Sequence, residues 1–560
     1  MRPGTQSEDF VTGQQWKQMM RAGARALELR KQEVDALNVF PVPDGDTGTN
    51  MHLTIQSAAR DAEKASGDSV SEIAAAASMG SLMGARGNSG VILSQLLRGI
   101  SKGLDGHQKA SSAQIAQAFQ TGVDTAYKAV MKPVEGTILT VSREVARGAL
   151  SKAKSGGTPI ETLQEGYKKG QLALAKTPEM LPALKQAGVV DAGGQGFLII
   201  LGGWISALEG IAVEPYQDLM TAKEMDEQAE RRFQVLEDLE YPYCTEFLVK
   251  GKELKADQIR LDLTGRGDSL LVVGTDEVIK IHIHTKNPGK VLDYAIQWGT
   301  LHEVQVHNML EQNEAMAHYL KEEGDSAQPL GVVDGSKVDT LKEHGIVAVA
   351  MGDGIAQVFS SLGVDQVVFG GQTMNPSTED LVEAVRRIAA KHIYILSNNG
   401  NIVMAARQVK DIVTEKEIYV IPSKSIPQGI AALVNFDPEG DAEENAKNME
   451  RSLSQVKSGE VTYAVRDSQY GEIEIKSGDT LGLVEDVIVT TGKDLLTVAK
   501  ETLEKMEWRG HDLVTIFYGQ DVEEEQVSLL EKWLSEQNKG IEIEVYPGNQ
   551  PLYYYIFGVE

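Results

Sequence analysis

The chain has 560 residues, a length that corresponds to three or four domains. Of these residues 42% are hydrophobic and 24% are charged, which is the ordinary composition of a globular protein. No apolar run reaches the ~18 residues of a membrane span, and the single cysteine excludes an internal disulfide framework. The net charge of −27 comes from residues 211–560, which hold 61 acidic and 32 basic side chains, a net of −29, whereas residues 1–210 carry a net of +2. This acidic balance argues against a nucleic-acid partner. We therefore expect a cytoplasmic protein without a transmembrane segment.

Residues 9–210 read as consecutive helices, because apolar residues recur every three or four positions between Gly- and Pro-containing links. The predicted helices cover residues 10–37, 51–64, 70–82, 89–102, 111–131, 138–153, 160–175 and 196–208. No strand is predicted in this region. We expect an all-α domain over residues 1–210 with its chemistry in the loops, and a charged helical linker over residues 211–240.

Beyond residue 240 the apolar pattern changes to that of strands. Residues 241–320 read as βαββαβ, which predicts an α+β, ferredoxin-like middle module. Residues 329–560 alternate apolar strands with helices, the pattern of an α/β region with a parallel sheet. A hairpin-rich stretch predicts a further boundary near residue 450. The predicted strands of the α/β region begin with residues 331–333, 346–350, 366–369, 392–396 and 417–421.

A loop with two carboxylates lies in the helical region. Asp44 and Asp46 flank one glycine, and two prolines stiffen the approach to them. Alternate carboxylates in such a loop can converge on a hard cation such as Mg2+. Backbone N–H groups and hydroxyls follow where a helix is predicted to begin, a favourable place for phosphate; they belong to Thr47, Gly48, Thr49 and Asn50. An ordinary solvated turn is the alternative, and Mg-nucleotide binding is the first hypothesis.

Three further glycine-rich junctions, at residues 84–90, 136–140 and 191–196, stand at predicted helix starts. Glycines let backbone N–H groups approach phosphate closely, and the Arg86 guanidinium can neutralise phosphate charge. The other candidate residues of these junctions are Gly87, Asn88, Ser89, Gly90, Thr137, Asp191 and Gly193. The alternative is tight turns and, for Thr137, a helix N-cap. None of the junctions has Walker or dinucleotide-fingerprint spacing, so a nucleotide would be bound by loops of an all-α domain.

The middle module carries a cysteine and a histidine pair. His282 and His284 alternate with isoleucines, so both imidazoles share one face of a strand. The first and third strands of a βαββαβ sheet are neighbours, which would bring Cys244 close to the histidines. Cysteine with two histidines is a ligand set for Zn2+, and a fourth ligand would come from His302 or His307. The alternative is a solvent-facing histidine pair and a buried cysteine.

In the α/β region, residues 370–377, 397–401 and 422–425 follow predicted strands and are rich in Gly, Asn and Ser. Loops beyond the carboxyl ends of parallel strands bind ligands or partners in open α/β sheets. Capping and turn chemistry is the alternative for these loops.

Together, residues 38–51, 84–90, 136–140 and 191–196 resemble the nucleotide-binding, all-helical domain of dihydroxyacetone kinases. The run Asn-Val-Phe-Pro-Val-Pro-Asp-Gly-Asp-Thr-Gly-Thr-Asn-Met is similar to that of a multidomain relative, the ATP-binding kinase component of bacterial fatty acid kinase. The resemblance covers the whole chain, including the middle module with its cysteine and His-x-His and the α/β C-terminal region.

The resemblance implies a helical barrel that binds ATP through Mg2+, with Asp44 and Asp46 as metal ligands. Asn38 falls near a third metal-ligating acidic position of the simpler dihydroxyacetone kinases, but here the residue is an amide at a different spacing. The resemblance further implies phosphate contacts from loop residues, namely Thr47, Thr49, Asn50, Ser89 and Gly90. In these relatives the cysteine and the histidine pair are functionally implicated.

The implied chemistry is phosphoryl transfer from ATP to a fatty acid carboxylate, giving an acyl phosphate for phospholipid synthesis. Such catalysis rests on positioning and charge neutralisation, and a carboxylate is already ionised near neutral pH. A separate fatty-acid-binding protein is implied to present the acyl group and to engage the C-terminal region, and the family is compatible with a homodimer. Two other hypotheses stay open: a small-molecule kinase acting on dihydroxyacetone or a similar polyol, and a non-catalytic nucleotide-sensing scaffold.

Overall fold

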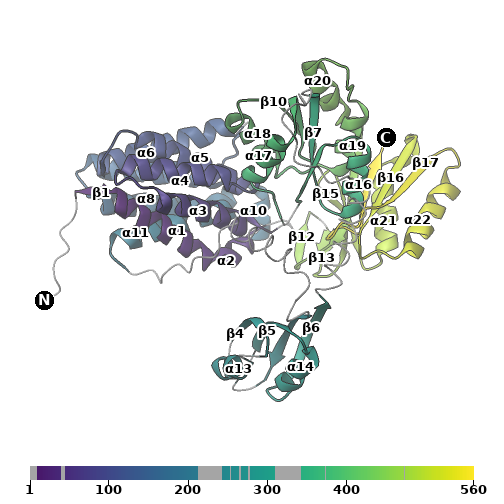
Figure 1. Cartoon of the computed structure of the whole chain (residues 1–560), viewed down its shortest axis with the longest axis horizontal. Coiled ribbons are helices and arrows are strands. Elements are labelled where there is room, and N and C mark those ends of the chain that lie inside the picture. Colours follow the sequence, from purple (N-terminus) through teal and green to yellow (C-terminus); the bar gives the residue numbers. More distant parts are fainter. Residues whose placement is uncertain are drawn as a thin grey trace, which may run out of the picture. The chain divides into compact units, whose positions relative to one another are not determined.

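The computed structural model divides into two compact units. The first combines Met1–Tyr216 with Thr340–Glu560, and the second is Gln217–Asp339. Figure 1 traces the chain through both units. The residues that the structure describes are 9–38, 45–130, 132–211, 243–251, 254–263, 266–274, 278–308, 342–371, 374–471 and 473–560.

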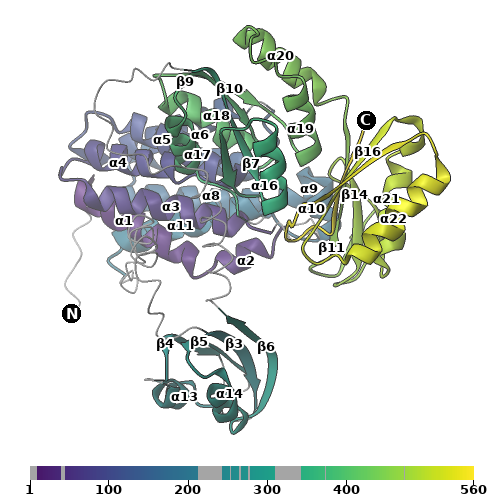
Figure 2. The ribbon, with the colours of Figure 1, turned by 45° about the vertical axis from the view of Figure 1, so that its right-hand side comes forward.

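The helical region of the first unit is a bundle of long helices packed pairwise (Figures 1 and 2). Its core includes three aromatic side chains, those of Trp16, Phe119 and Trp204. The ring centroid of Trp204 lies 6.0 Å from that of Trp16 and 6.0 Å from that of Phe119. Capping boxes begin several helices, as at Thr12 and Ser69. The elements are α1 (Gly13–Glu28), α2 (Lys31–Asp35), α3 (Thr47–Lys64), α4 (Val70–Met83), α5 (Gly87–Gly103), α6 (Ser112–Ala129), α7 (Ile138–Lys154), α8 (Pro159–Leu174), α9 (Thr177–Met180), α10 (Pro182–Ala187) and α11 (Ala192–Leu208).

Two predictions for this region are wrong. Residues 10–37 are not one helix, because β1 (Phe10–Thr12) precedes α1 and a break at residues 29–30 separates α1 from α2. The region also contains strands, since β1 pairs in antiparallel register with β2 (Lys109–Ser111). Strands of three residues are too short to produce a recognisable alternation of apolar residues, and their pairing joins segments far apart in the chain.

The first sheet of the C-terminal region is parallel, as predicted, with strand order β10-β9-β7-β8. Val347 and Val349 of β7 face the core that includes α17 and α18, whereas Ile346 and Ala348 face the core that includes α16 and α19. The predicted strand at residues 331–333 lies outside the described residues. The elements are β7 (Lys342–Ala350), α16 (Asp353–Ser361), β8 (Gln366–Phe369), α17 (Thr378–Arg387), β9 (Ala390–Leu396), α18 (Val403–Ile412), β10 (Glu417–Ile421), α19 (Ile426–Val434) and α20 (Ala442–Ser452).

A second, mixed sheet follows, with strand order β15-β14-β11-β18-β16-β17. Phe517 and Ile556 of this sheet join the apolar cluster that also contains Ile346 of β7, so the two sheets share a core. The elements are β11 (Lys457–Tyr463), β12 (Ser468–Tyr470), β13 (Ile473–Ile475), β14 (Thr480–Val484), β15 (Val487–Gly492), α21 (Leu495–Lys505), η1 (Trp508–Gly510), β16 (Leu513–Tyr518), α22 (Glu524–Gln537), β17 (Glu542–Pro547) and β18 (Tyr555–Val559).

The second unit holds an antiparallel sheet with strand order β4-β5-β3-β6. Phe247, Ile281 and Ile283 are buried on one face of the sheet, in a cluster with Ile259 and Val291 of its helices. A ferredoxin-like relationship stays a prediction. The elements are β3 (Tyr243–Lys250), α13 (Ala256–Leu263), β4 (Asp268–Gly274), β5 (Val278–Thr285), α14 (Pro288–Ile296) and β6 (Thr300–Asn308). In neither unit does a described helix have the length and apolarity needed to cross a membrane.

Candidate functional site

Asp46 lies at the N-cap of α3 but makes no side-chain hydrogen bond to the helix backbone. Its Oδ2 instead accepts a hydrogen bond from Nδ2 of Asn375, at 2.6 Å. Asn375 belongs to the C-terminal region, so the carboxylate that the sequence nominates for Mg2+ is engaged across the interface within the first unit. Asp44 lies outside the described residues, and its pairing with Asp46 stays a prediction.

A carboxylate that the sequence analysis did not nominate occupies the start of α3. Oδ1 of Asp35 accepts hydrogen bonds from the backbone N–H groups of Gly48, at 2.6 Å, and Thr49, at 3.1 Å. Oδ2 of Asp35 accepts from the Thr49 hydroxyl at 2.9 Å. A negative charge is favourable at this end of the helix dipole. Two of the N–H groups predicted to meet phosphate, those of Gly48 and Thr49, are therefore satisfied by Asp35 in this structure.

The remaining candidates near α3 are tightly placed. The Thr47 hydroxyl donates to Oδ1 of Asn38 at 2.9 Å, which ties the loop to the helix start. Gly48 packs directly against the Lys31 carbonyl and leaves no room for a side chain. Asn50 is buried in the first turn of α3. Its amide faces the next glycine-rich junction.

The 84–90 junction packs against this first turn. Gly87 opens α5 with a φ of +55°, and a Cβ there would lie 2.6 Å from Nδ2 of Asn50. Glycine satisfies both the positive φ and the close approach. Gly90 contacts the hydroxyl of Thr54 on α3, and Ser89 is partly buried between these two glycines.

Arg86 and Asn88 of the same junction bind residues of the C-terminal region. Nη1 of Arg86 donates to the backbone carbonyl of Asn375 at 2.8 Å, and Nη2 lies 3.6 Å from Oδ2 of Asp380. Nδ2 of Asn88 donates to Oδ1 of Asn401 at 3.0 Å. The cation that was predicted to neutralise phosphate is thus held at the same interface as Asp46.

The last two junctions adjoin each other. Thr137 is the N-cap of α7 and accepts from the Leu139 N–H at 3.4 Å, so its capping interpretation is confirmed. Asp191 caps α11 by accepting from the Gly194 N–H at 2.6 Å. Burial raises the pKa of the Asp191 carboxyl to about 6, against the opposing effect of backbone hydrogen bonds. A Cβ at Gly193 would lie 3.3 Å from Cβ of Ile138, the first residue of α7.

The start of α11 also reaches α3, because a Cβ at Gly196 would lie 2.8 Å from Sδ of Met51. Contacts therefore run from the 84–90 junction to the first turn of α3, from there to the start of α11, and on to the start of α7. Segments spread over some 150 residues of sequence are thus linked by contacts to the first turn of α3, which directly follows Asp46. Such a cluster of helix starts, with carboxylates and a guanidinium, is suited to a metal-bound polyphosphate.

In the second unit, Cys244 of β3 pairs in register with His284 of β5 on one side and His307 of β6 on the other. His282 pairs with Glu246, two residues along β3. Residues opposite each other on neighbouring strands lie on the same face of a sheet, so the backbone brings these residues to one face. The side chains of Cys244, His282 and His284 are outside the described set. The described side chains alone contain no group of three metal-ligating residues, and a zinc site stays a prediction.

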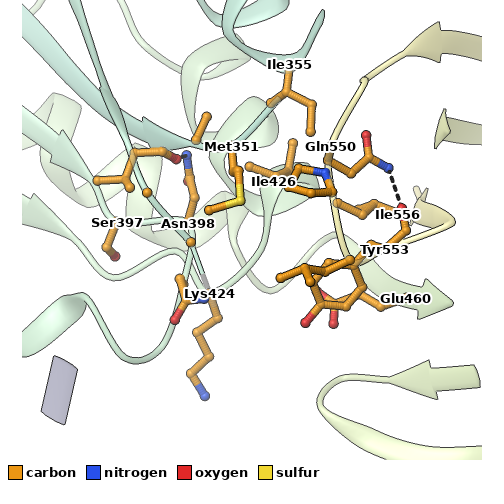
Figure 3. Close-up of a pocket in the computed structure, with 17 residues that line it drawn as sticks. Met351, Ile355, Ser397, Asn398, Lys424, Ile426, Glu460, Gln550, Tyr553 and Ile556 are labelled. Atoms are coloured by element: carbon orange, nitrogen blue, oxygen red, sulfur yellow. Dashed lines mark hydrogen bonds between the residues drawn. The ribbon is translucent and has the colours of Figure 1, made fainter. Parts of the chain in front are cut away.

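A small cavity of about 60 Å³ lies beyond the carboxyl ends of strands in the parallel sheet (Figure 3). Asn398, at its wall, donates to the Val349 carbonyl at 2.9 Å and accepts from the Ser423 hydroxyl at 2.8 Å. Lys424 extends away from Met351 in this view. Asn398 and Ser423 satisfy each other, which supports the capping and turn interpretation for these two residues.

Comparison with known proteins identifies the family. Residues 41–206 match the DAK2 domain, 240–316 match the middle domain of FakA-like fatty acid kinase proteins, and 345–560 match their C-terminal domain. Protein YloV of Bacillus subtilis (strain 168) is 43% identical over 560 residues, covering 98% of this chain and 99% of YloV. The chain belongs to the FakA-like family of fatty acid kinase proteins. Uncharacterized protein SAB1090 of Staphylococcus aureus (strain bovine RF122 / ET3-1), another relative, is 43% identical over 556 residues, with coverage of 98% and 99%.

Solved structures give lower similarity. The DegV family protein Cg2579 from Corynebacterium glutamicum aligns at 12% identity and a TM-score of 0.31, covering 39% of this chain and 98% of that one. The Streptococcus pneumoniae Fatty Acid Kinase (Fak) B3 protein loaded with linoleic acid aligns at 12% and 0.27, covering 39% and 99%. The dihydroxyacetone kinase from C. freundii in complex with AMP-PNP and Mg2+ aligns at 18% and 0.26, covering 36% and 34%.

Two residues of the site were missed by sequence reasoning. Asp35 was hidden because the predicted helix over residues 10–37 placed it in the last turn of one long helix, away from the start of the next. Asn375 was included only as part of a polar loop, because 329 residues separate it from Asp46 and no local pattern links them. Only correlated changes at the two positions among relatives would reveal such a contact in sequence.

Proposed function

We propose that this chain phosphorylates a fatty acid carboxylate with ATP and forms an acyl phosphate. The observation that carries this proposal is the chain of contacts that links three glycine-rich helix starts, those of α5, α11 and α7, to the first turn of α3, beside Asp46 and Arg86. A carboxylate oxygen of the fatty acid would form a bond to the γ-phosphorus of ATP, while the bond from that phosphorus to the β,γ-bridging oxygen breaks and ADP leaves. No proton has to be removed from the ionised carboxylate.

Asp44 and Asp46 would hold Mg2+. Oxygen donors of the kind that Mg2+ prefers gather at this loop, since Asn38 and the Thr47 hydroxyl lie 2.9 Å apart beside the Asp46 N-cap. When bound, Mg2+ supplies charge neutralisation for the phosphates. The residue set therefore fits the metal that the proposed reaction requires.

The other loop residues would bind and orient the nucleotide. Backbone N–H groups at the glycine-rich start of α5 would approach phosphate closely, and Arg86 would balance its charge. Asp35 satisfies the N–H groups of Gly48 and Thr49, so the phosphate contacts of the 47–50 run would come mainly from side chains. Catalysis of this kind depends on positioning rather than on a strong base.

A separate protein would present the fatty acid. FakA-like proteins are one component of fatty acid kinase, which supports an enzyme of more than one polypeptide. The cavity of about 60 Å³ in the C-terminal region is far smaller than the ~300–1,000 Å³ of ordinary ligand pockets. An acyl chain therefore does not fit this cavity, and the C-terminal region would serve as a docking surface for the acyl-binding partner.

The match to the DAK2 domain supports a second candidate, phosphorylation of dihydroxyacetone or a similar polyol without a protein partner. The test uses the purified chain, Mg-ATP and oleate or palmitate, with and without a purified acyl-binding protein. Acyl phosphate is trapped with hydroxylamine and quantified. Product only in the presence of the partner supports the fatty acid kinase, whereas phosphorylation of dihydroxyacetone without a partner supports the polyol kinase. ATP binding without phosphoryl transfer to either acceptor would instead support a non-catalytic nucleotide-sensing scaffold.

A further inference from the structure

One residue of the C-terminal region holds both charged groups at the phosphate end of the helical region. Asn375 lies between β8 and α17 and is only 1% exposed. Its side-chain amide donates to Oδ2 of Asp46 at 2.6 Å, and its backbone carbonyl accepts from Nη1 of Arg86 at 2.8 Å. The anion and the cation of the candidate site are thus both tied to one residue from elsewhere in the chain.

The position of Asn375 is fixed by contacts on both sides of it. Ser377 and Asp380 form a capping box that begins α17, and the backbone of Ser377 forms a bridge with Arg86. The next N–H, of Thr378, donates to the Ala85 carbonyl at 3.1 Å. Ala85 is itself part of an apolar cluster with residues of α17 and α18. The segment around Asn375 is therefore docked against the 84–90 junction.

The chemistry of this contact suits a metal site. An amide donor carries no charge, so it orients the Asp46 carboxylate without cancelling its attraction for a cation. A carboxylate can accept a hydrogen bond at one oxygen and bind a metal at the other. Ligands oriented by a neighbouring hydrogen bond bind metal more tightly, typically by ~10–100-fold.

We propose that Asn375 is a positioning residue for the nucleotide site, through which the C-terminal region sets the cation affinity of Asp46. The inference rests on the proposed Mg-nucleotide function of Asp46. The helical region then does not bind Mg-nucleotide independently of the C-terminal region. Because coupling is reciprocal, Mg-nucleotide binding also strengthens the docking of the 374–378 segment. A partner that binds the C-terminal region could therefore change the cation affinity of Asp46 through Asn375.

The test is the Mg2+ dependence of AMP-PNP binding to the full chain, measured by calorimetry without any acyl acceptor. Asn375→Leu removes the amide donor at similar size and keeps the backbone carbonyl that binds Arg86. The matched control is Gln408→Met, which removes a buried amide of the same interface but leaves the contacts of Asn375 itself; this amide donates to the Ser94 hydroxyl at 3.2 Å and accepts from the Thr378 hydroxyl at 3.1 Å. Asn375→Leu should raise the half-saturating Mg2+ concentration about tenfold, with Mg-free AMP-PNP binding unchanged. Gln408→Met should leave the Mg2+ dependence within about twofold of wild type.

Equal Mg2+ dependence in Asn375→Leu and Gln408→Met overturns the inference. Asn375→Leu could lower the thermal midpoint more than Gln408→Met does. In that case the Mg2+ dependence of AMP-PNP binding is measured again with Asn375→Ala, which adds no bulk, and that result decides the comparison. A wild-type chain whose AMP-PNP binding does not respond to Mg2+ contradicts the nucleotide function itself, and the inference with it. A wild-type chain that binds Mg-AMP-PNP but phosphorylates no fatty acid contradicts only the proposed acceptor and leaves this comparison decisive.

Discussion

The loop residues that meet at the start of α3 and those that line the cavity of the parallel sheet look alike in sequence, but their polar groups are used differently. Around α3, charged side chains such as Asp46 and Arg86 are held by Asn375 from another region of the chain. Beyond β9 and β10, neutral groups of Asn398 and Ser423 hydrogen bond to each other within one region. The difference teaches that loop composition alone does not separate a binding site from a structural lock. We propose that charged groups oriented by distant residues distinguish the candidate site.

The largest expected effect is at Asp46. Asp46→Ala should lower acyl phosphate formation at least about a hundredfold, because charge neutralisation is the main contribution to phosphoryl transfer. The thermal midpoint should fall only modestly: Asp46 makes no capping bond to α3, but the buried amide of Asn375 loses its acceptor. Activity and unfolding measured on the same preparation check both expectations. Asp411→Asn, which removes an exposed carboxylate of the first unit, serves as the control.

The next effect concerns the pH dependence of stability at Asp191. Its pKa is raised from 3.8 to about 6 in the folded protein, so ionisation opposes folding and stability falls as pH rises from about 4 through 6. The loss amounts to about 3 kcal/mol above that range. Asp191→Asn stays neutral and keeps an acceptor for the Gly194 N–H.

The variant should therefore be more stable than wild type at pH 8, with the advantage shrinking as the pH approaches 4. Urea unfolding of both proteins at each pH measures this difference. His52 also makes stability depend on pH. Burial lowers its pKa to about 4, so the folded protein becomes less stable as the pH falls from about 6.5 towards 4. Because His52 is present in both proteins, its contribution cancels in the difference in unfolding free energy between them. A variant that is less stable than wild type at pH 8 would show that the carboxylate is needed in its charged form.

In the loops of the parallel sheet, Asn398→Ala should destabilise the folded protein without changing its affinity for nucleotide. The change leaves the Val349 carbonyl and the Ser423 hydroxyl without their partner, at a cost of about 2 kcal/mol. Asn398 also has a φ of +51°, which alanine tolerates less well. Chemical unfolding measures the loss, and calorimetry with Mg-AMP-PNP should give wild-type affinity. Weaker nucleotide binding with unchanged stability would erase the contrast between the two loop sets.

The smallest effect is expected at Asp35. Asp35→Ala removes the carboxylate that caps α3 and should cost about 1 kcal/mol of unfolding free energy. Because the N–H groups of Gly48 and Thr49 then become accessible to phosphate, nucleotide affinity should hold or rise slightly. Unfolding and AMP-PNP titration check this pair of outcomes. A loss of Mg2+ dependence in Asp35→Ala would instead make Asp35 a metal ligand.

The sequence predicted what local pattern encodes. The long amphipathic helices and the buried parallel strands were found because a 3.6-residue period and continuous apolar runs are local signals. The strand pair β1–β2 was not found, since pairing over long separations leaves no such signal. The break before α2 was not found either. The motif residues of the site were recognised individually, and contacts such as Gly87 with Asn50 come from packing. Asp35 and Asn375 act only through the fold and could not be nominated from their neighbours.

The most direct measurement is transfer of the γ-phosphate label of ATP to oleate, with wild type and Asp46→Ala assayed side by side in the presence of Mg2+ and an acyl-binding protein. Labelled, hydroxylamine-sensitive oleoyl phosphate should form with wild type, disappear when the partner is omitted, and be absent with Asp46→Ala. Equal labelling of oleate by wild type and Asp46→Ala would contradict the site. Labelling of dihydroxyacetone instead of oleate by the wild-type chain would contradict the fatty acid kinase.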